Sequence, residues 1–195
     1  MNIRSVRKAL LLAGVAVFAV GCGDDPLDPN VTGAVNAEIH DTPAGAGEFT
    51  GTAAGNIFVS IRSTGGTWVD LGSPNGITVA LQSSSATSVH GVSSVPQGSY
   101  DRVRLTFSGV TFSIDAGGTV SGNVLSSGAS AVAANSTPLE LELSVSPFDV
   151  SSAGGTVGVS FDLNVENWID QQSLADGIIQ DGRIQGQVTV AVIGG

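Results

Sequence analysis

Besides serines and carboxylates, this sequence has few side chains that could act as a base or a nucleophile, with two histidines and one cysteine. His40 is followed directly by Asp41, and His90 lies in a serine-rich stretch. Hydrolysis needs a nucleophile, a base and a group that orients the base. The sequence has no Gly-x-Ser-x-Gly nucleophile elbow, and its two histidines lack the spacing of a zinc site. We therefore expect no enzyme and no cofactor, with a hydrolase or metal-dependent enzyme using His40, Asp41 and acidic residues as the alternative.

Carboxylates are abundant, and Ca²⁺ takes six to eight oxygen ligands. Asp170, Asp176 and Asp181 lie in or near residues 167–176, the one stretch that favours a helical turn or an ordered loop. The EF-hand pattern is missing. We expect a solvated acidic surface without a metal, and a calcium site at these three aspartates is the alternative.

Aromatic side chains could stack on sugar rings, and the candidates for ligand binding are Trp68, Trp168 and Tyr100. Both tryptophans have apolar neighbours in the sequence, which favours a place at the ends of the hydrophobic core. We expect core positions for both, with sugar binding as the alternative.

The single cysteine, Cys22, follows a cationic stretch at residues 1–8 and an apolar stretch at residues 9–20. Twelve apolar residues form a helix of about 18 Å, which is shorter than the roughly 30 Å hydrocarbon core of a bilayer. The arrangement resembles the signal peptide and lipobox of a bacterial lipoprotein. The resemblance implies a signal peptide at residues 1–21, acylation of Cys22, a tether within residues 22–32 and a folded domain over residues 33–195. Because Gly23 rather than Asp follows the cysteine, the expected location is the cell envelope, at the outer membrane.

Charge after Cys22 is strongly one-sided. All 17 acidic residues lie there against four arginines, a net charge of −13, and no lysine remains. The field of such a surface opposes binding of nucleic acid or anionic headgroups. Contact with a membrane should therefore come from the lipid on Cys22 alone.

Apolar residues of the mature chain alternate with polar ones, which is typical of strands with one buried face. The runs lie at residues 35–39, 57–61, 77–81, 103–114, 139–145, 157–165 and 184–192. A glycine at position 109 interrupts one run and predicts a bulge or bend. About eight or nine strands favour an antiparallel β-sandwich, with a closed barrel as the alternative. Residues 45–56, 83–94 and 126–137 are rich in small residues and are predicted to be loops, and Asp181-Gly182 predicts a tight turn.

Four segments together resemble a bacterial lipoprotein domain family of unknown function. They are GAVNAEIHDTPA at residues 33–44, GTWVDL at 66–71, VPQGSYDRVRL at 95–105 and FDL at 161–163, followed by a valine-rich strand. The third segment carries a Pro-x-Gly-x-Tyr motif that also occurs in prealbumin-like and immunoglobulin-like sandwiches. The resemblance implies that Pro96 and Gly98 form a turn, and that Tyr100 places its ring in the core and its hydroxyl against a backbone group. It implies no reaction.

These observations predict a lipid-anchored envelope protein with a non-enzymatic binding or scaffolding domain. The expected partners are the membrane, through the N-terminal lipid, and an envelope protein or polysaccharide. Self-assembly by strand addition at an exposed sheet edge is a further alternative.

Overall fold

The computed structural model describes residues 28–43, 50–115, 119–120, 123–124, 130–134, 138–169, 171–179 and 181–194. Most of these residues lie in strands, which confirms the expected all-β class. In chain order the elements are β1 (Asp28–Asp41), β2 (Thr50–Ser63), β3 (Trp68–Asp70), β4 (Asn75–Leu81), β5 (Ser83–Asp115), β6 (Thr119–Val120), β7 (Asn123–Val124), β8 (Ser130–Ala134), β9 (Leu139–Val150), β10 (Val157–Asp162), the 3-10 helix η1 (Val165–Asn167), α1 (Gln171–Asp176), β11 (Ile178–Ile179), α2 (Asp181–Ile184) and β12 (Thr189–Ile193).

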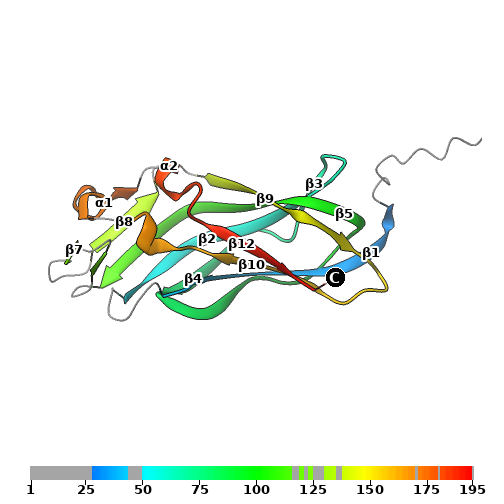
Figure 1. Ribbon diagram of the computed structural model, residues 1–195, viewed down its shortest axis with the longest axis horizontal. Helices are drawn as coiled ribbons and strands as arrows, with labels where there is room; N and C mark the ends of the chain where they lie inside the picture. Colours follow the sequence, from blue (N-terminus) through cyan, green and yellow to red (C-terminus); the bar gives the residue numbers. More distant parts are fainter. Residues whose placement is uncertain are drawn as a thin grey trace, which may run out of the picture.

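All described strands except the β6–β7 pair belong to one sheet. The 33-residue strand β5 holds this sheet together and runs most of the length of the molecule (Figure 1). Its first part pairs with β1, and β1 continues the sheet to β10 and β12. Its later part pairs with β2 and β9, and β2 in turn pairs with β3 and β4. Within the described residues the sheet is not closed, since no pairing joins β12 to β9.

The sheet is mixed, which corrects the expectation of purely antiparallel strands. Strand β1 runs parallel to β10, with Val35 opposite Val157 and His40 opposite Asp162. Strands β8 and β11 are also parallel. Alternation of apolar and polar residues predicts that a strand has one buried face, but it does not indicate which strand lies beside it. The parallel pairs therefore could not be predicted from this pattern.

Several boundaries differ from the sequence-based expectation. Strand β1 begins at Asp28, ahead of the expected domain start at residue 33, although its pairing with β5 is irregular between Asp28 and Thr32. Proline at position 29 has no N–H to give to a ladder, which agrees with this interruption. Residues 83–94, predicted as a loop, are the start of β5 and pair with β1. The predicted loops at residues 45–56 and 126–137 are wrong in part, because they contain the start of β2 and strand β8.

The core joins inward side chains of both parts of the sheet. The alternating residues of β1, β2 and β5 are buried as predicted, and Val35, Ile57 and Leu105 are each 0 % exposed. Strand β10 contributes Val159 and Phe161. Each fully buried side chain of this kind contributes roughly 1.5–3 kcal/mol, so burial of these faces is the main stabilising contribution in a domain without a disulfide.

The environment of Tyr100 is the one that the Pro-x-Gly-x-Tyr resemblance implied, but the turn expected at Pro96 and Gly98 is wrong, because both residues lie within strand β5. The Tyr100 ring is 0 % exposed and stacks against Phe148, with 5.8 Å between ring centroids. Its hydroxyl donates a hydrogen bond of 2.6 Å to the carbonyl oxygen of Pro96. Burial raises the pKa of Tyr100 to about 12, so the hydroxyl keeps its proton and remains a donor at ordinary pH.

The chain after β10 departs from a strand. Strand β10 ends at Asp162, Asn164 adopts a left-handed conformation with φ 49°, and η1 follows. Helix α1 lies within the stretch expected to hold a helical turn or ordered loop, whereas the turn predicted at residues 181–182 is wrong because α2 begins there. Among the described residues no helix has both the length and the apolarity needed to cross a membrane.

Candidate binding site

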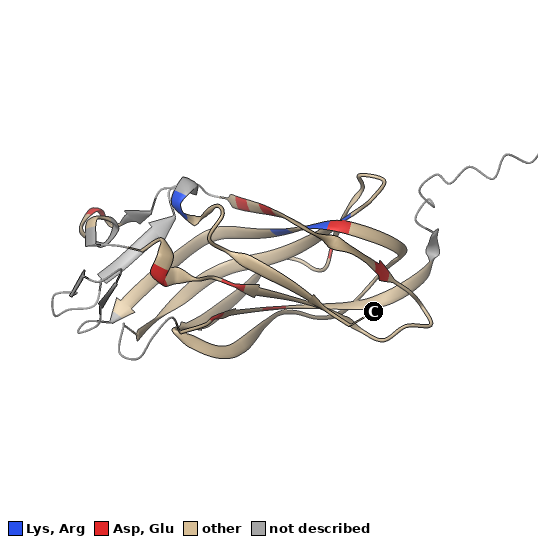
Figure 2. Ribbon diagram, viewed as in Figure 1, with Lys and Arg blue, Asp and Glu red and all other residues tan. Residues whose placement is uncertain are grey.

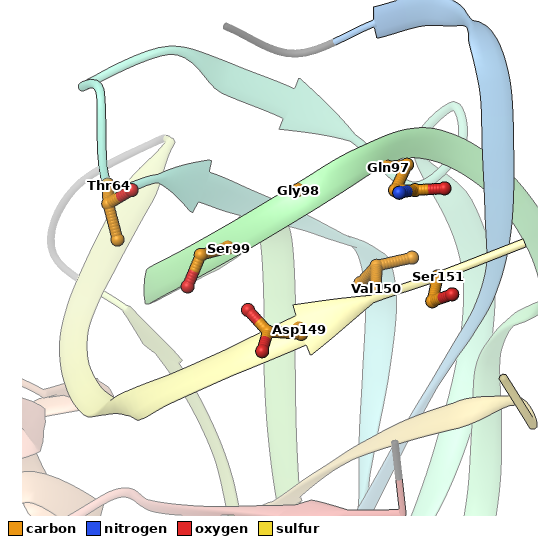
Figure 3. A pocket seen from close by; sticks show the side chains of 7 residues that line it. All are labelled: Thr64, Gln97, Gly98, Ser99, Asp149, Val150 and Ser151. Carbon is orange, nitrogen blue, oxygen red and sulfur yellow. The ribbon is translucent and has the colours of Figure 1, made fainter. Parts of the chain in front are cut away.

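A polar hollow opens at the end of the molecule where β1 begins. Its volume is about 570 Å³, and strand ends and a turn build its walls. The lining residues are Thr64, Gln97, Gly98, Ser99, Asp149, Val150 and Ser151. Figure 3 shows the side chains of Thr64, Ser99 and Asp149 gathered on one side, with Gln97 and Ser151 further along the two strands.

Pairing of β5 with β9 fixes the two long walls of the hollow. Gly98 lies opposite Val150, and Ser99 lies opposite Asp149. Residues that face each other in an antiparallel pair have Cα atoms about 4.5 to 5.5 Å apart. The Ser99 hydroxyl and the Asp149 carboxylate are therefore held as neighbours by the backbone.

The turn between β2 and β3 supplies the third wall and is tied to β5. The N–H of Thr64 donates to the carbonyl oxygen of Ser99 at 3.0 Å. Inside the turn, the N–H of Thr67 donates to the hydroxyl oxygen of Ser63 at 3.0 Å. Gly66 has φ 90°, a conformation that glycine adopts without steric cost. These bonds place the Thr64 side chain over the hollow.

The floor beneath these polar groups is rigid. Val150 is 1 % exposed, and a side chain at Gly33 would overlap the Val150 side chain and the backbone of Ser151. The stacked pair of Tyr100 and Phe148 lies next along the same two strands. A preformed wall loses little conformational entropy when a ligand binds.

The chemistry of the lining suits a ligand rich in hydroxyl or amide groups. Thr64, Ser99 and Ser151 offer hydroxyls, which both donate and accept, and Gln97 offers an amide. Asp149 is the one charged lining residue and accepts hydrogen bonds when ionised. Nearby, the Arg62 guanidinium of β2 donates three hydrogen bonds to Asp101 of β5, from Nε at 3.3 Å and from Nη2 at 3.1 and 3.3 Å.

A ladder of charged residues continues along the same part of the sheet, as Figure 2 shows for β5 and β9. Arg104 lies opposite Glu142 in the register, and Arg102 donates to Glu142 at 2.9 Å. Arg104 also approaches Glu140 at 3.7 Å. These arginines and glutamates attract one another across the two strands, and such exposed pairs each contribute little stability.

The three aromatic candidates lie in two different environments. Trp168 is 2 % exposed, packs edge-on against Phe112 and donates its indole N–H to the carbonyl oxygen of Leu163 at 2.8 Å. Trp168 and Tyr100 are therefore core residues and offer no ring face to a ligand. Trp68 is half-buried, and Arg104 lies over its ring at 3.9 Å from the centroid. The expected core position of Trp68 is wrong, because β3 pairs on one side only and places this ring beside the charged ladder.

His40 lies on β1 between two polar residues of β10. Its Nδ1 is 3.4 Å from the Ser160 hydroxyl, and its Nε2 is 3.6 Å from Asp162. Both distances exceed those of strong hydrogen bonds, and Ser160 is 6 % exposed. The other oxygen of Asp162 accepts the N–H of Thr42 at 3.0 Å. The three side chains thus form a cross-strand polar cluster in which the carboxylate also holds the backbone.

Asp41 is fully buried and holds two backbone segments together. Its carboxylate accepts the N–H of Gln82 at 2.8 Å and the N–H of Val165 at 2.9 Å. Burial raises the pKa of Asp41, the two N–H groups lower it, and the charge of Asp162 raises it again. Gln82 has the unusual φ of 52°, so Asp41 fastens a strained turn and the start of η1 to the end of β1.

His90 lies on a different pair of strands from His40, where β3 and β4 leave a gap along β2. The Val59 N–H donates to His90 Nε2 at 3.2 Å. A side chain at Gly72 would overlap the His90 ring, and the Ser93 hydroxyl donates to the carbonyl oxygen of Leu71. Burial lowers the pKa of the imidazole, while the charge of Asp70 opposes that shift. The structure therefore does not bring His40 and His90 into one site.

Neither Asp176 nor Asp181, the calcium candidates within the described residues, lines the hollow. Asp176 is exposed, and its carboxylate accepts a hydrogen bond of 2.8 Å from Gln172. Asp181 begins α2, and Asp170 lies outside the described residues. Within the described part of the chain no three His, Cys, Asp or Glu side chains are placed to hold a metal ion. Cys22 also lies outside the described residues.

Sequence reasoning missed the residues that line the hollow. The signal was present in part, because Gln97 and Ser99 are the variable positions of the Pro-x-Gly-x-Tyr motif that predicted the turn. Asp149 and Ser151 follow a recognised strand but carry no motif of their own. Comparisons of the chain with protein-family models, with curated proteins and with solved structures find no match.

Proposed function

We propose that this protein is a lipid-anchored component of the cell envelope whose domain binds a hydroxyl-rich ligand, such as an envelope polysaccharide, in the polar hollow. The main observation that supports this proposal is the hollow of about 570 Å³, which is lined by three hydroxyls, one amide and one carboxylate. Sugar hydroxyls donate and accept hydrogen bonds, and side chains of these types can answer both roles.

The fold and the leader support this proposal. A cationic and apolar leader that ends in a cysteine is suited to export and acylation at Cys22, with the outer membrane as the location. Two or more acyl chains attach a protein durably to a membrane. We propose further that the two parts of the sheet, joined by β5, face each other as the layers of a β-sandwich around the shared core. The hollow then lies at the tether end of the domain, within reach of polysaccharide close to the membrane.

The proposal is tested by calorimetric titration of the protein with oligosaccharides released from purified envelopes. Asp149→Asn removes a charge from the lining, and the affinity should fall about tenfold, since hydrogen bonds to a charged group contribute roughly 1.5–3 kcal/mol. Ser99→Ala should weaken binding less, because a neutral hydrogen bond contributes about 1 kcal/mol.

Asp176→Asn is the matched control, because it removes the same charge from an exposed residue in α1 outside the hollow. Its affinity should equal that of the wild type. If all three variants bind alike, or if no fraction binds at millimolar concentration, the hollow is not a saccharide site.

A further inference from the structure

Strand β12 forms an open edge of the sheet. It pairs with β10 on one side, from Gly158 opposite Ile193 to Asp162 opposite Thr189. On its other side no described strand is hydrogen-bonded to it. The backbone groups on that side remain able to pair with another strand.

This edge lacks the features that usually block strand addition. The strand reads Thr-Val-Ala-Val-Ile, without charge or proline, and Ile193 is 60 % exposed. Edge strands are commonly protected by charged residues, by proline or by being very short. The absence of charge on β12 is visible in Figure 2.

The other edges of the sheet are better protected. Strand β9 carries Glu140, Glu142 and Asp149 together with Pro147. Strands β3 and β11 have only three and two residues. Strand β4 is uncharged, but only Gln82 separates its end from the start of β5.

We propose that β12 is a self-association edge, at which a second copy of this chain adds its own β12 in antiparallel orientation. The strand is suited to a two-fold partner because its exposure pattern is symmetric about Ala191: positions 189, 191 and 193 are exposed and positions 190 and 192 are half-buried. Two copies then pair Ala191 with Ala191 and Thr189 with Ile193, each on the same face of the extended sheet. An interface of this kind uses one patch on both partners.

The distribution of charge favours pairing with a second copy at this edge over other approaches. The mature chain has a net charge of −13 from 17 acidic residues and four arginines, so most approaches of one copy to another are repulsive. At β12 the nearest carboxylate in the register is Asp162, one strand further in and opposite Thr189. Like charges directly opposite each other would destabilise the pairing, and this pairing has none.

Cysteine cross-linking tests the proposal. In an Ala191→Cys variant the two introduced thiols face each other with Cα atoms about 4.5 or 5.5 Å apart, within the range that a disulfide spans. Mild oxidation of the full-length protein in native membranes should convert most of it to a disulfide-linked dimer. Ser144→Cys on β9 and Thr78→Cys on β4 are the controls, since both positions are exposed on edge strands. Their cross-linking should be at least tenfold slower.

A second variant separates loss of pairing from loss of folding. Adding Ile193→Glu to Ala191→Cys adds a negative charge to each copy at the interface and should reduce dimer formation about tenfold, while the melting temperature stays close to that of the parent variant. Equal cross-linking rates at the three strands, or no effect of the glutamate, would overturn the proposal. Repeating the assay in a Cys22→Ser background, with purified protein, keeps the result independent of acylation.

Discussion

The side chain of His90 provides a hydrogen bond that no strand provides at one point of β2. Its Nε2 accepts the Val59 N–H at a point where β2 has neither β3 nor β4 beside it. A buried N–H without a partner costs roughly 1–3 kcal/mol. The bond requires Nε2 to be unprotonated, so the neutral form of His90 is the form that fits the folded chain.

The pH dependence of stability follows from the pKa of His90. Burial lowers the folded-state pKa below the ordinary value of 6.5, so between the two values the unfolded chain binds more protons. The free energy of unfolding should therefore be highest above pH 6.5 from this cause and should fall as the pH falls toward the folded-state pKa. Urea unfolding at pH 7.5, 6.5 and 5.5 measures this change in the free energy of unfolding.

The matched variants for this test are His90→Gln and His40→Gln. Glutamine at position 90 can accept the Val59 N–H but does not titrate, so the loss of stability between pH 7.5 and 5.5 should shrink. His40 lies at the 3.6 Å contact with Asp162 and not in the gap. If both variants keep the slope of the wild type, His90 does not cause it.

Residue roles could be read from the sequence where a local pattern defines them. The Pro-x-Gly-x-Tyr motif predicted the buried ring and bonded hydroxyl of Tyr100, and alternation predicted the buried faces of strands such as β1 and β2. The role of Asp41 could not be read, because its partners Gln82 and Val165 are distant in the chain. The residues that line the hollow could not be predicted for the same reason, since β9 lies beside β5 only in the folded chain.

At the scale of elements, a glycine bulge shapes the pairing of β2 with β5. Ala54 lies opposite Thr111 and Asn56 opposite Ser108, so β5 has one extra residue there. Gly109 has φ 68°, as the predicted bulge requires. Gly55 on the opposite strand has no room for a side chain, because a Cβ atom would lie 2.7 Å from the Cα of Val110.

Three glycine-to-alanine variants separate steric overlap from conformational cost. Gly55→Ala meets backbone and should lower the free energy of unfolding by about 1–3 kcal/mol or more. Gly109→Ala meets nothing within 4 Å, so it should cost about 1–2 kcal/mol from its left-handed φ alone. Gly91→Ala, with open space and no left-handed φ, should change stability by less than about 1 kcal/mol. Urea midpoints in the order Gly55, Gly109, Gly91 from lowest to highest are expected, and a different order would contradict this account.

Alternation found the buried faces of most strands, but it failed where small polar residues form a strand. Residues 83–94 are largely serine, alanine and threonine, which favour loops when judged locally. Pairing with β1 overrides this preference, and Val89 of this segment is buried in the core, whereas Val92 is exposed. Strand propensity depends strongly on such context.

At the scale of the whole molecule, β1 lies in the middle of one part of the sheet although it comes first in the described chain. It pairs with β5 on one side and with β10 on the other. Strand β1 is therefore a central strand of this part of the sheet (Figure 1). A force on the proposed lipid anchor would act along a strand bonded on both sides, which is a firm attachment for a tethered domain.

The anchor itself is tested at Cys22. Cells that express the wild type should incorporate an alkyne-labelled fatty acid into the protein, and mass spectrometry should find Cys22 as its acylated first residue. Cys22→Ala removes the thiol, so the variant should carry no label and should keep residues 1–21. Gly23→Asp is the matched control next to the same site: it should keep the label, and fractionation should recover it with the inner rather than the outer membrane. A wild-type protein without label, or a Cys22→Ala variant labelled equally well, would show that another feature holds this domain at the membrane or that nothing does.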